Sequence, residues 1–182
     1  MKKIRRIVVK VDSARRRAVL EAAAALADKL EAELVGLFVE NVDLLHFAGL
    51  PFAREVGIAS AKQRPLDVAA MERSLRALAK EAHETLALIA RDTQVRWSFR
   101  VARGPEAPEL LATVTDEDLV IANLALADEL ARGAAVRIVR AGDWEELRAA
   151  LEAEPGGILV LVGSDDALVG ETLRKLRERA GT

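Results

Sequence analysis

The sequence predicts an α/β protein: a three-layer, open, mostly parallel sheet of five to six strands with helices on its faces. Two observations predict this class. Short runs of apolar and β-branched residues alternate with longer amphipathic stretches along the chain, as strands and helices do in a layered α/β domain. The first apolar run, residues 4–13, ends in Asp12 and Ser13 just before an Ala/Leu-rich stretch, which is typical of a buried strand that turns into a capped helix.

The next elements continue this pattern and then interrupt it. An Ala-rich apolar face predicts a helix over residues 14–30, and residues 33–40 form a second apolar strand, so the two strands should be parallel. Residues 41–65 break the alternation, because they are too long for an ordinary loop and too apolar for a linker. We consider three roles for them: a lid over the carboxyl edge of the sheet, an apolar surface for a partner, or packing on their own domain.

A long helix follows, beginning near Asp67 and ending near Arg91. Its apolar residues recur at helical spacing and should form a core face. They are Val68, Met71, Leu75, Leu78, Ala82, Leu86 and Ile89.

The second half of the chain resumes the alternation. Residues 95–101 alternate apolar and polar side chains, which indicates a strand at the edge of the sheet. The remaining elements are predicted in order as a helix over 106–113, a strand over 118–122, a short helix over 124–132, a strand over 135–139, a helix over 144–151, a strand over 158–162 and a helix over 165–179.

Length and composition favour one domain over residues 1–182, since a chain of this size buries a sizeable core. The absence of Cys excludes a disulfide framework, a thiolate metal site and a Cys nucleophile. We find no leader sequence and no apolar run near the roughly 20 residues of a membrane span, so we expect a cytoplasmic protein without membrane contact. A formal charge of −2 and a basic cluster without aromatic residues argue against a nucleic-acid partner.

Few residues could carry catalysis or bind a metal. The two histidines, His46 and His83, are more readily explained as structural side chains. Residues 163–166, Gly-Ser-Asp-Asp, lack the second glycine of a nucleophile elbow and are better explained as a helix cap. The acidic run at 116–118 should be a solvated turn at the amino end of a strand. We therefore expect neither an enzyme nor a metal site.

The blocks IVVKVDS, AELVGLFVE, WSFRVARG and DEDLVIAN, with the long apolar segment and the long helix between them, together resemble the universal stress protein family over residues 4–123. The resemblance implies a Rossmann-like, adenine nucleotide alpha hydrolase-like fold, with the first strand in mid-sheet between the second and fourth. Ligands of such sheets bind at the topological switch point. That crevice would hold Asp12, Ser13 and Asn123, although Asp12 or Ser13 could equally cap the following helix.

In the ATP-binding branch of that family, the resemblance assigns the adenosine to Asp12 and to the backbone of Phe38 and Val39. The branch also has a glycine-rich phosphate loop after the fourth strand. Here the corresponding stretch, LALADELARG, has a single glycine and two carboxylates, Asp128 and Glu129, which would repel phosphate. ATP should therefore not bind in the usual family manner.

The resemblance leads to a non-catalytic universal stress-type protein of stress response or regulation, acting as a homodimer or through an unknown protein partner. The alternative is an adenine-nucleotide-binding protein, at most a weak ATPase, with a phosphate contact from Arg15 or Arg132. A third reading is a regulatory domain acting on a transporter or kinase in trans. Residues 141–182 either complete the sheet or form an appended strand and helix, the remnant of a second unit, because they resemble the opening of another copy of the fold.

Overall fold

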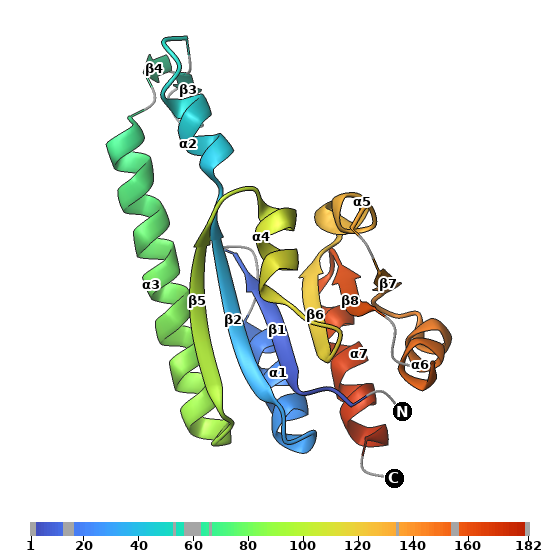
Figure 1. The fold of residues 1–182 in the computed structure, drawn as a ribbon. Helices are drawn as coiled ribbons and strands as arrows, with labels where there is room; N and C mark the ends of the chain where they lie inside the picture. Colours follow the sequence, from blue (N-terminus) through green and yellow to red (C-terminus); the bar gives the residue numbers. More distant parts are fainter. Residues whose placement is uncertain are drawn as a thin grey trace.

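The computed structural model describes residues 3–12, 17–52, 54–56, 63–65, 67–133, 135–153 and 157–180. They form an α/β fold around one open sheet of six parallel strands, in the order β5-β2-β1-β6-β8-β7 (Figure 1). The predicted fold class, a Rossmann-like parallel sheet between helices, is confirmed.

The strands of the main sheet are β1 (Arg6–Val11), β2 (Glu33–Glu40), β5 (Trp97–Arg103), β6 (Asp118–Asn123), β7 (Val136–Arg140) and β8 (Ile158–Gly163). The helices are α1 (Arg17–Lys29), α2 (Val42–Ala48), α3 (Val68–Thr93), α4 (Glu106–Thr113), α5 (Ala127–Leu130), α6 (Trp144–Glu152) and α7 (Asp166–Arg179), with a 3-10 turn, η1 (Leu124–Leu126), before α5. The short strands β3 (Arg54–Val56) and β4 (Gln63–Pro65) pair antiparallel in a separate sheet.

Two hydrophobic clusters cover the two faces of the sheet. On one face α1, α3, α6 and α7 pack over alternate strand residues such as Ile7, Val9 and Ile121. On the other face α4, η1 and α5 pack over Val8, Val120 and their neighbours. Because successive residues of a strand point to opposite faces, a run such as IVVKV must be apolar throughout to serve both clusters. Lys10 interrupts that run.

The order of the strands places the switch point of the sheet. The connections from β1 to β2 and from β2 to β5 pass through α1 and α3 on one face, whereas α4 carries the chain from β5 to β6 on the other face. The direction of winding therefore reverses between β1 and β6, which are adjacent. The crevice outside the carboxyl ends of these two strands is the place where open α/β sheets bind ligands.

The positions of two strands, β8 and β5, can be compared with the expectations from the sequence. Strand β8 lies inside the sheet, paired with β6 on one side and with β7 on the other, so it completes the main sheet. Strand β5 is paired with β2 and ends the sheet on that side, as predicted for an edge strand.

The prediction that the whole apolar stripe of α3 is core was wrong for its first half. Leu86 and Ile89 are buried, but Val68, Met71, Leu75 and Leu78 are only half-buried. The first turns of α3 extend past the carboxyl edge of the sheet together with α2, β3 and β4, so they have no sheet beneath them (Figure 1). Within the described residues, no helix is both long and apolar enough to span a membrane.

Candidate functional site

The residues predicted for the nucleotide crevice come together at the carboxyl ends of three neighbouring strands. Asp12 directly follows β1, Asn123 ends β6, and Phe38 and Val39 lie near the end of β2. In the parallel ladder Phe38 is the register partner of Val11, which places the end of β2 beside Asp12. Ser13 lies outside the described residues.

Each of these residues also has a structural task. The Asn123 carboxamide oxygen accepts a hydrogen bond from the Ala125 N–H at 3.0 Å and thereby caps η1. Phe38 and Val39 are buried, and their backbones pair with β5 at Val101 and Ala102. The side chains of Phe38 and Val39 are therefore part of the core, which leaves Asp12 as the predicted residue whose charge faces the crevice.

Lys10 is the main residue of the crevice that the sequence reasoning missed. It lies in β1, is 5% exposed, and points to the same face as Val8, under the start of α4. Its ammonium nitrogen lies 3.0 Å from Oε2 of Glu106 and 3.5 Å from Oδ2 of Asp12. A buried ammonium needs such partners because removing it from water is costly. The sequence did contain a signal for it: a lysine within a run of β-branched residues, in a strand that helices should cover on both faces, must be buried and therefore paired.

The charges of this cluster matter for any ligand. Lys10 brings one positive charge, and Asp12 and Glu106 bring two negative charges on side chains that are about a quarter exposed. The ammonium is thus already paired twice, and the formal charges of these three side chains sum to −1. An entering anion such as phosphate would compete with these two carboxylates for the ammonium of Lys10.

The chain after β6, where the resembled family has its phosphate loop, is helical and packed. Leu126 and Leu130 are buried against the sheet, 7% and 0% exposed, and they hold η1 and α5 in place. Asp128 and Glu129 lie in the first turn of α5. In glycine-rich loops, free backbone N–H groups bind the phosphates. Here the backbone N–H groups at the end of α5 and directly after it donate to carbonyl oxygens of the preceding turn instead.

A small cavity lies beside Asp12 on the opposite face of β1. It has a volume of about 120 Å³ and is lined by apolar residues of β1, α1 and α3 together with Glu81 and Thr85. Ligand pockets of proteins usually have about 300–1,000 Å³. The cavity is therefore small for an adenosine, and two of its lining residues, Asp12 and Glu81, are acidic.

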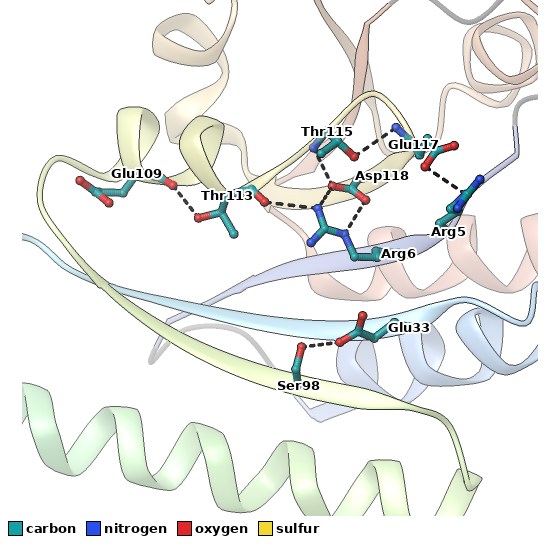
Figure 2. Close-up of polar contacts among 9 residues, drawn as sticks. All are labelled: Arg5, Arg6, Glu33, Ser98, Glu109, Thr113, Thr115, Glu117 and Asp118. Carbon is teal, nitrogen blue, oxygen red and sulfur yellow. Dashed lines mark hydrogen bonds and ion pairs between the residues drawn. The ribbon is translucent and has the colours of Figure 1, made fainter.

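At the opposite, amino-terminal edge of the sheet, Asp118 of the acidic run 116–118 forms a buried ion pair with Arg6 of β1 (Figure 2). Asp118 is fully buried and accepts hydrogen bonds from Arg6 Nε at 2.9 Å and Nη2 at 2.5 Å. It also accepts one from the Thr115 N–H at 2.7 Å. The bond to Asp118 raises the pKa of Arg6. The predicted solvated turn is therefore wrong for Asp118, because pairing with Arg6 allows the carboxylate to be buried. This pair joins β1 to β6.

The other polar candidates have structural roles or lie at the surface. His83 is exposed, and its ring contacts the rings of Trp97 and Phe99 at centroid distances of 5.3 Å each. Asp165 caps α7 by accepting from the Ala167 N–H at 2.8 Å, which confirms the predicted helix cap. Among the residues that the structure describes, no group of three or more His, Cys, Asp and Glu side chains could hold a metal ion.

Neither the known protein-family models nor the curated proteins give a match to this chain. The class of protein that the structure establishes is therefore the α/β, Rossmann-like one.

Proposed function

We propose that this chain is a non-catalytic, cytoplasmic protein of the universal stress type, which acts in stress response or regulation by binding a second copy of itself. The observation that carries the proposal is an exposed apolar surface at the projecting end of the molecule. We call it the Phe47 surface. It consists of Phe47, near the end of α2, and of Leu50 and Phe52, which follow α2; their exposed fractions are 51%, 41% and 72%. Water-exposed aromatic residues that lie close together are typical of binding surfaces.

The surroundings of this surface support the same interpretation. The half-buried residues of the α3 stripe lie on the helix that packs against α2. An apolar partner that covered both α2 and this part of α3 would bury the residues that the sheet leaves uncovered, at a gain of about 25 cal/mol per Å². The regulatory-domain alternative, with a transporter or kinase as the partner in trans, would use the same surface.

The crevice supports a function that does not depend on ATP. Its cation, Lys10, is paired with Glu106 and Asp12, and the chain after β6 is a packed helical segment with acidic residues. These are the features that should weaken triphosphate binding in the manner of the resembled family.

Sedimentation equilibrium of the full chain tests the proposal. We expect a dimer of about twice 19.7 kDa at micromolar concentration, and a shift toward the monomer for Phe47→Ser and Phe52→Ser. Leu168→Ser is the matched control, because Leu168 is 39% exposed on α7 and lies outside the Phe47 surface. A monomeric mass at every concentration, or an equal effect of Leu168→Ser, would contradict self-association through this surface.

The second candidate is an adenine-nucleotide-binding protein, at most a weak ATPase, and the position of Asp12 and Asn123 at the carboxyl ends of the adjacent strands β1 and β6 favours it. Asp12 and Asn123 would line the ligand, with Arg132, exposed after α5, as a phosphate contact. Its test is phosphate release from magnesium-ATP. Release that disappears in Asp12→Ala would support this candidate, and release no faster than in buffer would exclude hydrolysis.

A further inference from the structure

A second cavity lies between α6 and α7, built from residues that take no part in the crevice. Its volume is about 400 Å³, within the range of about 300–1,000 Å³ that is usual for small-molecule sites. Leu151 and Leu176, each 4% exposed, belong to the core and form its apolar floor. The ring of Trp144 lines it as well, and Arg148, Glu152 and Arg179 supply its charged groups.

The sequence places these groups by helix geometry. Asp143 caps α6, accepting from the Glu146 N–H at 3.0 Å, so Trp144 is the first residue of the helix. Arg148 and Leu151 follow at the i+4 and i+7 positions and therefore share a face with Trp144. Leu176 and Arg179, three residues apart at the end of α7, share a face in the same way. The two faces meet around the cavity.

Trp144 is the most informative residue of this site. The guanidinium carbon of Arg179 lies 4.9 Å from the centroid of the indole ring, in a cation-π contact. The indole Nε1 is buried and has no hydrogen-bond partner among the residues that the structure describes. A buried N–H without an acceptor is uncommon and costs free energy, so the site is suited to a ligand that brings an acceptor oxygen.

The charges select the class of ligand. The position for a cation over the ring is taken by the chain's own Arg179, which argues against an ammonium ligand. Arg148 pairs with Glu145 at 2.9 Å and with Glu152 at 3.6 Å, and both pairs are exposed to water. Exposed pairs contribute little free energy, so Arg148 can exchange them for a better acceptor. Two guanidinium groups beside an apolar floor suit a carboxylate on an apolar chain or ring.

We propose that the cavity between α6 and α7 binds a small carboxylic acid with an apolar chain or ring. The apolar part lies on Leu151 and Leu176 beside Trp144, and the carboxylate is held by Arg179 and Arg148.

Fluorescence of Trp144 tests this with sodium octanoate as the probe. The chain has two tryptophans, so the full chain carrying Trp97→Phe reports on Trp144 alone. We expect a saturable change in emission with octanoate and at least about tenfold weaker binding of octan-1-ol, which has the same chain without the charge. Arg179→Gln and Arg148→Gln should each weaken octanoate by about tenfold and leave octan-1-ol unchanged.

Two controls separate a specific site from general effects. Arg174→Gln removes a charge from an exposed residue of α7 that does not line the cavity, and Asp12→Ala alters the crevice; both should leave octanoate affinity unchanged. Amide NMR shifts of Leu151 and Leu176 in the unaltered chain provide a readout that needs no variant. Equal affinity for octan-1-ol, equal loss in Arg174→Gln, or the absence of saturable fluorescence and NMR changes would overturn the proposal.

Discussion

The ammonium nitrogen of Lys10 lies 3.0 Å from Oε2 of Glu106, so an ion pair connects the central strand β1 with the first turn of α4, which packs on one face of the sheet. Asp12, at 3.5 Å, is the second partner of the same ammonium. The crevice at the switch point of the sheet is therefore occupied by charges that belong to the chain itself.

Removing the ammonium should destabilise the protein. Lys10→Met leaves Glu106 and Asp12 without their shared cation, and we expect a loss of about 1–3 kcal/mol, less than for a fully buried pair because both carboxylates reach water. Urea denaturation measures this loss. The double variant Lys10→Met/Glu106→Gln should recover part of the stability. If its loss instead equals the sum of the losses of Lys10→Met and Glu106→Gln measured singly, the two residues are not coupled.

The pair between Arg6 and Asp118 should contribute more, because Asp118 is fully buried. Asp118→Asn leaves the guanidinium of Arg6 without its counter-ion, and we expect a loss of about 2–4 kcal/mol, equivalent to a fall in Tm of roughly 5–15 °C for a domain of this size. Glu117→Gln is the matched control, since Glu117 pairs with Arg5 at the exposed surface and should change stability by less than about 0.5 kcal/mol. Equal losses would contradict this assignment.

The same variant has a defined pH dependence. The hydrogen bond to Asp118 raises the pKa of Arg6 above its ordinary value. A group with a raised folded-state pKa contributes its full stability below the unfolded-state pKa and loses it only as the pH rises through the folded-state pKa, which for Arg6 is strongly alkaline. The stability difference between the protein and Asp118→Asn should therefore stay constant from about pH 7 to about pH 9. A difference that fell within this window would exclude a permanently charged Arg6.

Gly36 of β2 should be intolerant of any side chain. A Cβ there would lie 2.6 Å from Cδ2 of Leu86 and 2.8 Å from Cδ2 of Phe99, because α3 and β5 pack closely on this strand. Gly36→Ala should cost about 1–3 kcal/mol by overpacking. Gly170→Ala in α7 has the opposite expected sign, since a Cβ there would lie 4.0 Å from the backbone oxygen of Ala18, an ordinary contact, and alanine favours a helix by up to about 1 kcal/mol. Thermal unfolding of both variants would reveal whether the signs differ.

Local patterns were enough to predict the fold class and nearly all elements of the main sheet. The helix over 106–113 was predicted with its observed bounds, because Gly104 and Pro105 mark its start. The place of β8 between β6 and β7 could not be read from its apolar run, which says that a strand is buried but not which strands flank it. The incomplete burial of Val68, Met71, Leu75 and Leu78 on α3 was missed because amphipathicity predicts an apolar stripe and not what covers it.

Only the residues of the candidate site that lie at the ends of strands could be predicted from the sequence. Asp12 and Asn123 follow apolar strands, so their convergence at one edge followed from the topology. The pairs Lys10 with Glu106 and Arg6 with Asp118 join residues far apart in the chain, and no local pattern selects such partners. The resemblance to a known family did not indicate Lys10, because it assigns ligand contacts only to residues at the ends of the strands and Lys10 lies within β1.

The claim that function lies on the Phe47 surface and not in the crevice is tested most directly by calorimetric titration of the purified full chain with magnesium-ATP. The account predicts no saturable heat at micromolar protein, because Lys10 is already paired and the chain after β6 is packed and acidic. Saturable binding of micromolar affinity, lost in Asp12→Ala and retained in Phe52→Ser, would contradict it and establish the crevice as a nucleotide site.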